Sequence, residues 1–442
     1  MKSGALLEHL ASSFTEPVRD PLWGNIFLSP GLEALANSGP FAKLARIKQL
    51  GPAHLVYPGA THTRRAHSLG VFHMARRLCQ ALVARGGIEF VTREGLDSFL
   101  AAALCHDLGH FPFAHSLKEL PLADHEALTA RLLVEEPLRS LVGTSGADPE
   151  ATAAIVDQDL PDRGDREIRF FRGLLSGVLD PDKLDYLTRD AFFCGVPYGI
   201  QDSDFILQRV GIAEEDRLGI EERGLMSVES LLFSKYLMYR SVYWHKGVRA
   251  ATSMIKKAVL LALGEAILAP EDLYGLDDDS FYASLRAIKF APFALAEAVF
   301  EGRLYPVVLD LPFDEGDERH RGLLDLGARL RLEGEIAERA SVGRTRLSPL
   351  DIVVDLPEPV SFETDLCVIM DRGRPGNGAG SSLGFAQSPT VFSPPVVAGF
   401  ARALRRVRVF CADSQAAVGK AAHELLGGGQ ARGVVAVSSG KA

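Results

Sequence analysis

Residues 104–116, LCHDLGHFPFAHS, place three histidines and an aspartate at the end of a stretch that otherwise suits a buried helix. The residues before them, SFLAAA at 98–103, are almost wholly apolar. Burying a polar group without a partner costs roughly 2–7 kcal/mol, so these side chains must be paired with something. Pro112 is expected to end the helix, which lets His115 fold back toward the other polar residues.

The histidines of this chain are concentrated in one part of the sequence. Eight of the twelve lie within residues 54–125, which indicates a single site. His106 and His110 are four residues apart, so they would share one face of a helix, and Asp107 can turn toward the same pocket. His67 opens an earlier helix, directly after the polar TRRA. Because imidazole and carboxylate are the usual ligands of Mn, Fe, Zn or Mg-type ions, the pattern favours a divalent metal site.

A second polar stretch, LDPDKLDYLTRDAFFCG, supplies further candidates. Asp182, Tyr186 and Asp190 follow one another at four-residue steps and would form one stripe of a helix. The alternative is a solvated helix face that carries an ion pair between Asp185 and Arg189. The apolar residues that flank the stripe favour burial over that alternative.

The elements that position these residues are mostly helical. Helical spacing dominates from about residue 30 to 265, with one helix expected over 66–84 and a long helix or a bent pair over 228–263. The β-branched runs LYPVVLDL at 304–311 and DIVVDL at 351–356 predict strands.

The chain is therefore expected to be mainly α. We place a helical core at 1–265, a helical connector at 266–340 and a smaller C-terminal α/β lobe at 341–442. Composition predicts a flexible loop near 371–395, and the terminal SSGKA reads as a loose tail.

Composition narrows the class of protein. The 442 residues are 47% apolar and 24% charged, which is ordinary for a globular protein. A net charge of −9 argues against broad electrostatic binding to nucleic acid or to an anionic membrane, although a local basic patch is not excluded. The five cysteines form no CxxC pair, the N-terminus lacks a signal-peptide core, and no run approaches the roughly 20 apolar residues of a membrane span. A soluble, cytoplasmic protein with reduced thiols is expected.

Taken together, the polar motifs resemble those of a known family. The series is IKQLG (47–51), PGATHTRRAHSLGV (58–71), CHDLGHFPFAH (105–115), DHE (124–126) and DPDKLDYLTRD (180–190). It resembles the HD-domain phosphohydrolase superfamily, and within it the dNTP triphosphohydrolase branch, over roughly residues 16–260. The resemblance implies an HD-type helical core around the site.

The resemblance also implies a metal site and a reaction. The divalent ion would be held by His67, His106, Asp107 and Asp182, with Asp185 as the alternative fourth ligand. Enzymes of this branch attack the α-phosphorus of a dNTP with water and release deoxynucleoside and tripolyphosphate. A homo-oligomer is implied as well.

Further site residues follow from matching the family's motifs position by position. His125 matches the catalytic histidine, while His110, His115 and Arg64 would line the phosphate that is attacked. The outer phosphates would be held by Lys183, Tyr186 and Lys235. Gln49 and Asp190 would read the sugar 3′-hydroxyl, and Leu50 and Tyr243 would crowd the 2′ position.

This chain departs from the family at two places. The acidic residue that usually orients the catalytic histidine is replaced by Lys118, so Glu119 or Asp124 would have to serve, or general-acid catalysis would be weaker. The positions that read an activating guanine nucleotide in the animal enzyme correspond to Ala42 and Ala45, which predicts a lost or altered activator site.

Two alternatives to a dNTP triphosphohydrolase stay open. One is a phosphohydrolase for another nucleotide, such as a 5′-monophosphate or a cyclic dinucleotide. The other is a catalytically weak sensor of nucleotides or nucleic acid.

Overall fold

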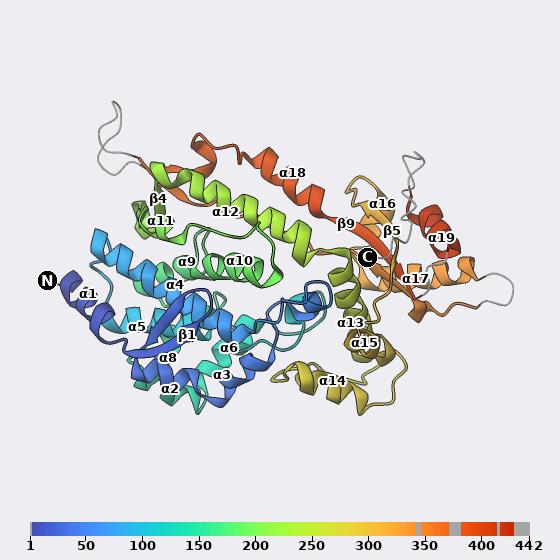
Figure 1. The fold of residues 1–442 in the computed structure, drawn as a ribbon, viewed down its shortest axis with the longest axis horizontal. Helices are drawn as coiled ribbons and strands as arrows, with labels where there is room; N and C mark the ends of the chain where they lie inside the picture. The colour runs from blue at the N-terminus through green and yellow to red at the C-terminus, as the bar shows by residue number, and fades with distance from the viewer. Residues whose placement is uncertain (1, 342–345, 371–381, 413–415, 428–442) are drawn as a thin grey trace.

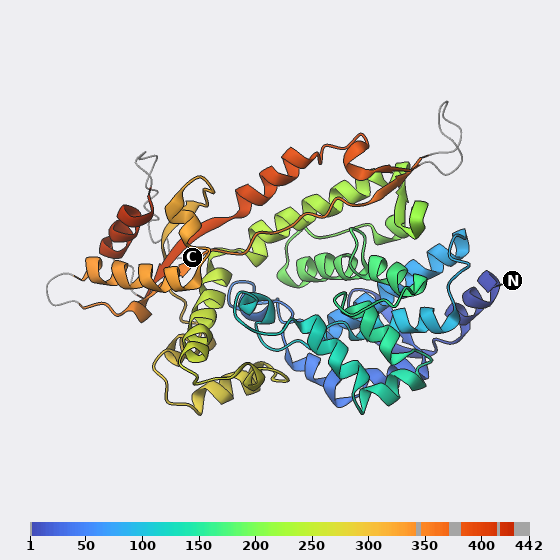
Figure 2. The ribbon, with the colours of Figure 1, turned by 180° about the vertical axis from the view of Figure 1, so that it is seen from behind.

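The structure, a computed structural model, describes residues 2–341, 346–370, 382–412 and 416–427. The protein is mainly α with a smaller α/β region toward the C-terminus, as predicted. Figures 1 and 2 show the helical region, which carries the N-terminus, at one end of the molecule and the α/β region at the other. Among the described residues, no helix combines the length and the apolar character needed to cross a membrane.

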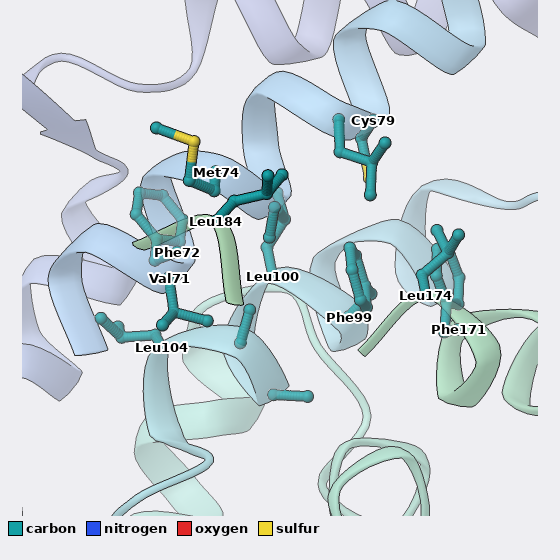
Figure 3. Packing of buried hydrophobic residues seen from close by; sticks show 14 of the residues in the cluster. Val71, Phe72, Met74, Cys79, Phe99, Leu100, Leu104, Phe171, Leu174 and Leu184 are labelled. Atoms are coloured by element: carbon teal, nitrogen blue, oxygen red, sulfur yellow. The ribbon is translucent and has the colours of Figure 1, made fainter. Parts of the chain in front are cut away.

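Three long helices form the centre of the helical region: α4 (Arg64–Arg85), α5 (Arg93–Cys105) and α10 (Pro181–Cys194). Their apolar faces meet in the core drawn in Figure 3, where Val71 and Phe72 of α4 lie near Leu100 and Leu104 of α5 and Leu184 of α10. All five side chains are fully buried. Because each such burial stabilises the fold by about 1.5–3 kcal/mol, this packing fixes the helices that carry the polar motifs.

Shorter helices cover this centre: α1 (Lys2–Ser12), α2 (Pro30–Ala36), α3 (Gly39–Lys43), α6 (His125–Val134), α7 (Leu138–Thr144), α8 (Pro149–Val156), α9 (Arg166–Leu175) and α11 (Ser203–Leu207). The element predicted over 228–263 is a bent pair, made of α12 (Leu225–Met238), a π-helical turn (Tyr239–Tyr243) and α13 (Lys246–Gly264). A π-helical turn inside a helix is rare and is often found at functional sites.

The helix that leads to the His-Asp doublet is shorter than predicted. α5 ends just before His106, well short of Pro112. The hydroxyl of Thr129 donates to the His106 carbonyl (3.0 Å) and accepts from the Gly109 amide (2.8 Å). These backbone groups are thus satisfied by a side chain instead of by a further helical turn. The prediction that His106 and His110 share a helix face is therefore wrong, because His106 lies on the turn after α5 and His110 follows that turn.

The described strands form three sheets. Their orders are β1 (Glu16–Asp20)–β2 (Gly24–Leu28); β3 (Val210–Ile212)–β4 (Leu218–Glu221)–β7 (Cys367–Ile369)–β8 (Ser382–Gly384); and β5 (Val307–Pro312)–β9 (Arg406–Cys411)–β6 (Ile352–Asp355). The strands predicted at 304–311 and 351–356 are confirmed as β5 and β6, which both pair antiparallel with β9. Asp355 accepts hydrogen bonds from Arg249 Nε (3.0 Å) and Ser253 Oγ (2.8 Å) of α13, so this sheet is anchored to the helical region.

The remaining helices are α14 (Asp278–Arg286), α15 (Phe293–Phe300), α16 (Glu318–Gly322), α17 (Leu326–Ala340), α18 (Pro394–Leu404) and α19 (Ala416–Leu426). β5 falls inside the predicted connector, and β7 and β8 join a sheet with strands of the helical core. The division of the chain at 265 and 340 stays a prediction. Of the predicted flexible loop, residues 371–381 lie outside the described residues, and so does the terminal SSGKA.

Residues 356–366, here called the strap, link β6 to β7 without regular secondary structure. Val360 and Phe362 of the strap pack with Tyr236 and Trp244 in one buried cluster. α18 lies alongside α12 in both views, and the rings of Phe400 and Tyr236 are 4.6 Å apart. The C-terminal part of the chain thus covers the helix that faces the polar motifs.

Candidate active site

The predicted site residues gather around one cavity of about 920 Å³. With the exception of His110 they all line it: Gln49, Leu50, Arg64, His67, His106, Asp107, His115, His125, Asp182, Lys183, Tyr186, Asp190, Lys235 and Tyr243. His110 is fully buried behind the wall, with its ring centroid 3.9 Å from that of His125. Residues far apart in the chain therefore share one site.

At the base of the cavity, nitrogen and oxygen donors converge. Ligand atoms of His67, His106 and Asp107 lie within 4.8 Å of one another. Asp182, in the first turn of α10, brings Oδ1 to 2.9 Å from His67 Nε2 and 4.0 Å from His106 Nε2. Three of these donors thus converge, and Asp182 lies beside both imidazoles, a set of nitrogen and oxygen ligands that can hold a divalent cation.

A second layer of contacts orients these donors. His67 Nδ1 lies 2.9 Å from Asp185 Oδ2, and His106 Nδ1 lies 3.0 Å from the Ala103 carbonyl. Metal-binding histidines generally donate their other ring N–H in this way, which leaves Nε2 available for the metal. Asp185, the alternative fourth ligand, thus lies on the opposite side of the His67 ring from Asp182.

Asp185 belongs to a buried ion-pair network. It accepts hydrogen bonds from Arg189 Nε and Nη2, both at 2.8 Å, and from Trp23 Nε1 at 2.5 Å. Asp185 and Arg189 do form the ion pair of the alternative interpretation, but both side chains are completely buried, so the solvated face of that alternative is wrong and burial is confirmed for this pair. A Cβ at Gly70 would overlap Asp185 and lie 2.5 Å from Arg189 Nη2, which explains a glycine at this point of α4.

The pKa values of these donor side chains are strongly shifted by their surroundings. Burial alone would lower the pKa of His67, but hydrogen bonds to Asp182 and Asp185 outweigh it and raise the pKa to about 10. Burial disfavours the charged form of Asp107, but the close contact with His110 Nε2 and the Arg64 guanidinium hold its pKa well below the ordinary value. Arg64 Nη1 donates to Asp107 Oδ2 at 2.7 Å. The site thus keeps its carboxylates ionised, as cation binding requires.

Three histidines form the adjacent wall. The His110 ring contacts both His115 (4.7 Å between centroids) and His125 (3.9 Å), and His115 folds back as predicted. Nε2 of His110 and Nε2 of His125 lie 3.2 Å and 3.9 Å from Asp107 Oδ1. Burial, reinforced by Arg64, lowers the pKa of His115 to about 3 and that of His110 well below its ordinary value. Both rings are therefore neutral at pH 7.

The carboxylate beside the predicted catalytic histidine is one that the sequence interpretation missed. Glu126 Oε2 lies 3.0 Å from His125 Nδ1. Burial would raise the pKa of Glu126, but His125 outweighs it and lowers the pKa to about 2. Glu119 instead pairs with Arg329 and Lys256, and Asp124 lies 3.5 Å from Lys118. Glu126 directly follows His125 in the motif DHE, and this adjacency could have identified it from the sequence.

Replacing Gly109 by alanine should displace His125. A Cβ at Gly109 would lie 2.6 Å from the Thr129 amide and would overlap the His125 carbonyl, so the start of α6 would have to move. Since a shift of about 1 Å can cost roughly 100-fold in rate, we expect turnover to fall about 10–100-fold while the metal content is retained. Steady-state kinetics and metal analysis check this.

Gly143→Ala is the matched control, because nothing lies within 4 Å of a Cβ at that exposed end of α7. Its turnover should equal that of the unsubstituted protein. Equal turnover of the Gly109→Ala variant would show that α6 tolerates the added methyl group and would contradict the expectation.

A polar group on α10 lies at the other end of the cavity. Asp190 accepts a hydrogen bond from Tyr243 Oη (2.7 Å) and lies 2.8 Å from His62 Nε2. Gln49 Oε1 is buried without a hydrogen-bond partner among the described residues. His62 was not among the predicted site residues, and its contact with Asp190 joins it to the site. An unpaired amide oxygen and a fixed carboxylate in one cavity suit a hydroxyl-bearing ligand.

Two buried lysines line the same cavity, and each is paired with a carboxylate. Lys183 Nζ lies 2.6 Å from Asp180 Oδ2, and Lys235 Nζ lies 3.0 Å from Glu363 Oε2. Burial opposes the ionisation of Glu363, but Lys183 and Lys235 outweigh it and lower its pKa to about 2. Glu363 belongs to the strap, and nothing in its local sequence identified it as a site residue.

These features define a class of protein. Around one cavity, the helical core presents a set of possible cation ligands, neutral histidines and lysine ammonium groups. Such groups bind a phosphate and catalyse its transfer to water.

Comparison with known proteins agrees with this class. Residues 64–162 match the model of the HD domain, and residues 202–375 match that of the HD associated region. An uncharacterized protein of Methanocaldococcus jannaschii is 30% identical over 80% of this chain and 72% of its own length. The deoxynucleoside triphosphate triphosphohydrolase SAMHD1 of Danio rerio is 29% identical over 58% of this chain and 47% of its own length. A crystal structure of a hypothetical protein from Aquifex aeolicus matches with a TM-score of 0.68 at 25% identity, covering 92% of this chain and 99% of that one.

The chain belongs to the HD-domain phosphohydrolases, in the branch that resembles the dNTP triphosphohydrolases. For several of the relatives, the matching part spans only about half of the relative's length.

Proposed function

We propose that this hydrolase is a metal-dependent deoxynucleoside triphosphate triphosphohydrolase. Water attacks the α-phosphorus, the bond from phosphorus to O5′ breaks, and deoxynucleoside and tripolyphosphate leave. The observation that supports this proposal is that the donor set, the three histidines and the two lysines line or border the same cavity. A monophosphatase has no use for lysines placed beyond the attacked phosphate.

The donor set fits a divalent cation held by His67, His106, Asp107 and Asp182. Without a cation, the shortest contact within this set, 2.9 Å from His67 Nε2 to Asp182 Oδ1, is an ion pair that a cation would replace. When bound, the cation lowers the pKa of a water molecule or polarises the phosphoryl oxygen. Metal analysis of the purified protein identifies which of Mn, Fe, Zn or Mg it binds.

The chain's own groups would handle the substrate and the protons. His125 transfers a proton at O5′ as general acid, with its ring oriented by Glu126. Arg64, whose Nη1 is engaged by Asp107, offers its remaining N–H groups to the α-phosphate, and His110 and His115 line the same phosphate. Lys183, Tyr186 and Lys235 bind the outer phosphates.

The sugar would lie against α10 and the residues that precede α4. Gln49 and Asp190 contact the 3′-hydroxyl, and Leu50 and Tyr243 occupy the space that a 2′-hydroxyl would need. A ribonucleotide would have to bury that hydroxyl against Leu50 without a partner, which costs free energy.

Product analysis tests the proposal. The purified protein with Mn²⁺ is incubated with each dNTP, GTP and dGMP, alone and in mixtures. We expect tripolyphosphate and deoxynucleoside from dNTPs and at least about tenfold slower turnover of GTP, because the 2′-hydroxyl would be buried without a partner. Mixtures show whether one nucleotide activates hydrolysis of another.

Other outcomes would assign the site differently. Orthophosphate from dGMP alone would contradict the proposal in favour of a nucleotidase acting on monophosphates. Metal binding without turnover of any nucleotide would favour a sensor. The homo-oligomer proposed from the relatives is tested separately by light scattering.

A further inference from the structure

The subsite proposed for the outer phosphates carries no net charge. Lys183 and Lys235 contribute two positive charges, and Asp180 and Glu363 contribute two negative ones. Glu363 Oε2 lies 3.0 Å from Lys235 Nζ and 3.6 Å from Lys183 Nζ, so a single carboxylate oxygen faces both ammonium groups. A polyphosphate oxygen would need the same place.

The two acids differ in how firmly they are held. Asp180 is the N-cap of α10: its Oδ1 accepts from the Lys183 amide at 2.6 Å, and its side chain is almost completely buried. Glu363 sits on the irregular strap, and its side chain is 37% exposed. Only Glu363 can therefore move away without unravelling a helix end.

The strap keeps Glu363 near the lysines from two sides. Ser361 Oγ donates to Glu363 Oε1 at 3.0 Å, and the neighbouring Phe362 is buried with its ring 5.6 Å from Lys235 Nζ. The apolar anchor holds the backbone of the strap, so a side-chain rotation of Glu363 is enough to vacate the subsite.

We propose that Glu363 is an internal anion that exchanges with the phosphate chain of the ligand. It leaves Lys183 and Lys235 when a polyphosphate enters and returns to them when tripolyphosphate departs. Glu363 is thereby a residue that sets the affinity of the site for polyphosphates and keeps it from being blocked by its own product. The inference rests on the proposed function, in which these lysines bind the outer phosphates.

Glu363→Gln tests the exchange, because it removes the charge and keeps the shape. Calorimetry on the metal-loaded protein measures the Kd of inorganic tripolyphosphate and, separately, of orthophosphate. We expect the Kd of tripolyphosphate to fall roughly tenfold, the size of one charged hydrogen bond. The Kd of orthophosphate should fall much less, because a single phosphate offers the two lysines fewer oxygens and less charge than a polyphosphate does.

Asp365→Asn is the matched control. It removes the same charge two residues further along, where the side chain is 88% exposed and pairs with Arg217, so the Kd of tripolyphosphate should change by less than about twofold. An unchanged or higher Kd for tripolyphosphate in Glu363→Gln would overturn the proposal. An equal gain for both anions would overturn it too, since only the general electrostatic field would have changed.

Binding of tripolyphosphate requires no turnover, so the two proposals can fail separately. Absence of dNTP hydrolysis together with the expected change in tripolyphosphate binding would contradict the proposed function alone. Hydrolysis of dNTPs with no effect of Glu363→Gln on tripolyphosphate binding would contradict the exchange alone.

Discussion

Asp182→Asn is expected to abolish catalysis by removing the bound cation. Asp182 Oδ1 faces Nε2 of both His67 and His106, and its side chain is 38% exposed, so the amide should be accommodated by the fold. An amide oxygen is a much weaker ligand than a carboxylate in a set rich in histidine. We expect cation affinity to fall more than about 100-fold, beyond the loss caused by an outer-shell change. Turnover should fall about 10³-fold or more. Metal analysis after dialysis, together with the product assay, measures both effects.

Asp185→Asn provides the contrast. Asp185 is fully buried and is one of two carboxylates that pair with Arg189, the other being Asp20, so its substitution weakens this network without isolating the charge and should lower the free energy of unfolding by about 1–3 kcal/mol. Because Asp185 only orients His67, cation affinity should fall no more than about 10–100-fold. Full cation binding by Asp182→Asn, with complete loss in a folded Asp185→Asn protein, would make Asp185 the fourth ligand instead.

The local sequence was sufficient to predict the elements but not their ends. Apolar spacing predicted α4, the bent pair α12–α13 and strands β5 and β6, because those signals depend on residues close in the chain. The end of α5 was predicted wrongly at Pro112, since the groups that terminate it belong to Thr129, more than 20 residues away. When the hydroxyl that caps a helix belongs to a residue of another helix, the sequence of the capped helix does not indicate where it ends.

The same distinction holds for the site. The ordered motifs were enough to select residues that the fold brings to one cavity. Two of the residues missed have roles that depend on a distant partner, His62 beside Asp190 and Glu363 beside Lys235, whereas the third, Glu126, is adjacent to His125 in the sequence. Glu363 comes from a strap more than 100 residues beyond the last motif, in a segment whose composition is typical of a loop. Only the packing of that strap on α12 shows that the proposed phosphate subsite is neutralised.

His125→Ala is expected to lower turnover about 10³-fold without loss of the cation. Nε2 of His125 is 3.9 Å from Asp107 Oδ1, close enough to serve the reacting phosphate but outside the donor set. Among the three histidines of this wall, burial keeps His110 and His115 neutral, and His125 has a carboxylate oxygen, that of Glu126, 3.0 Å from its Nδ1. Loss of a general acid costs typically 10²–10⁴-fold.

Glu126→Gln tests whether Glu126 acts only by orienting His125 or contacts the substrate itself. The amide keeps the side chain that contacts Nδ1 but removes its charge, so turnover should fall about 10–100-fold, less than in His125→Ala. If Glu126 acts through His125, Glu126→Gln should have no further effect in the His125→Ala background, because the two changes then remove the same contribution. Additive losses in the double variant would show that Glu126 contacts the substrate directly. Loss of the cation in His125→Ala would instead place His125 among the ligands, and its role as a proton donor would have to be abandoned.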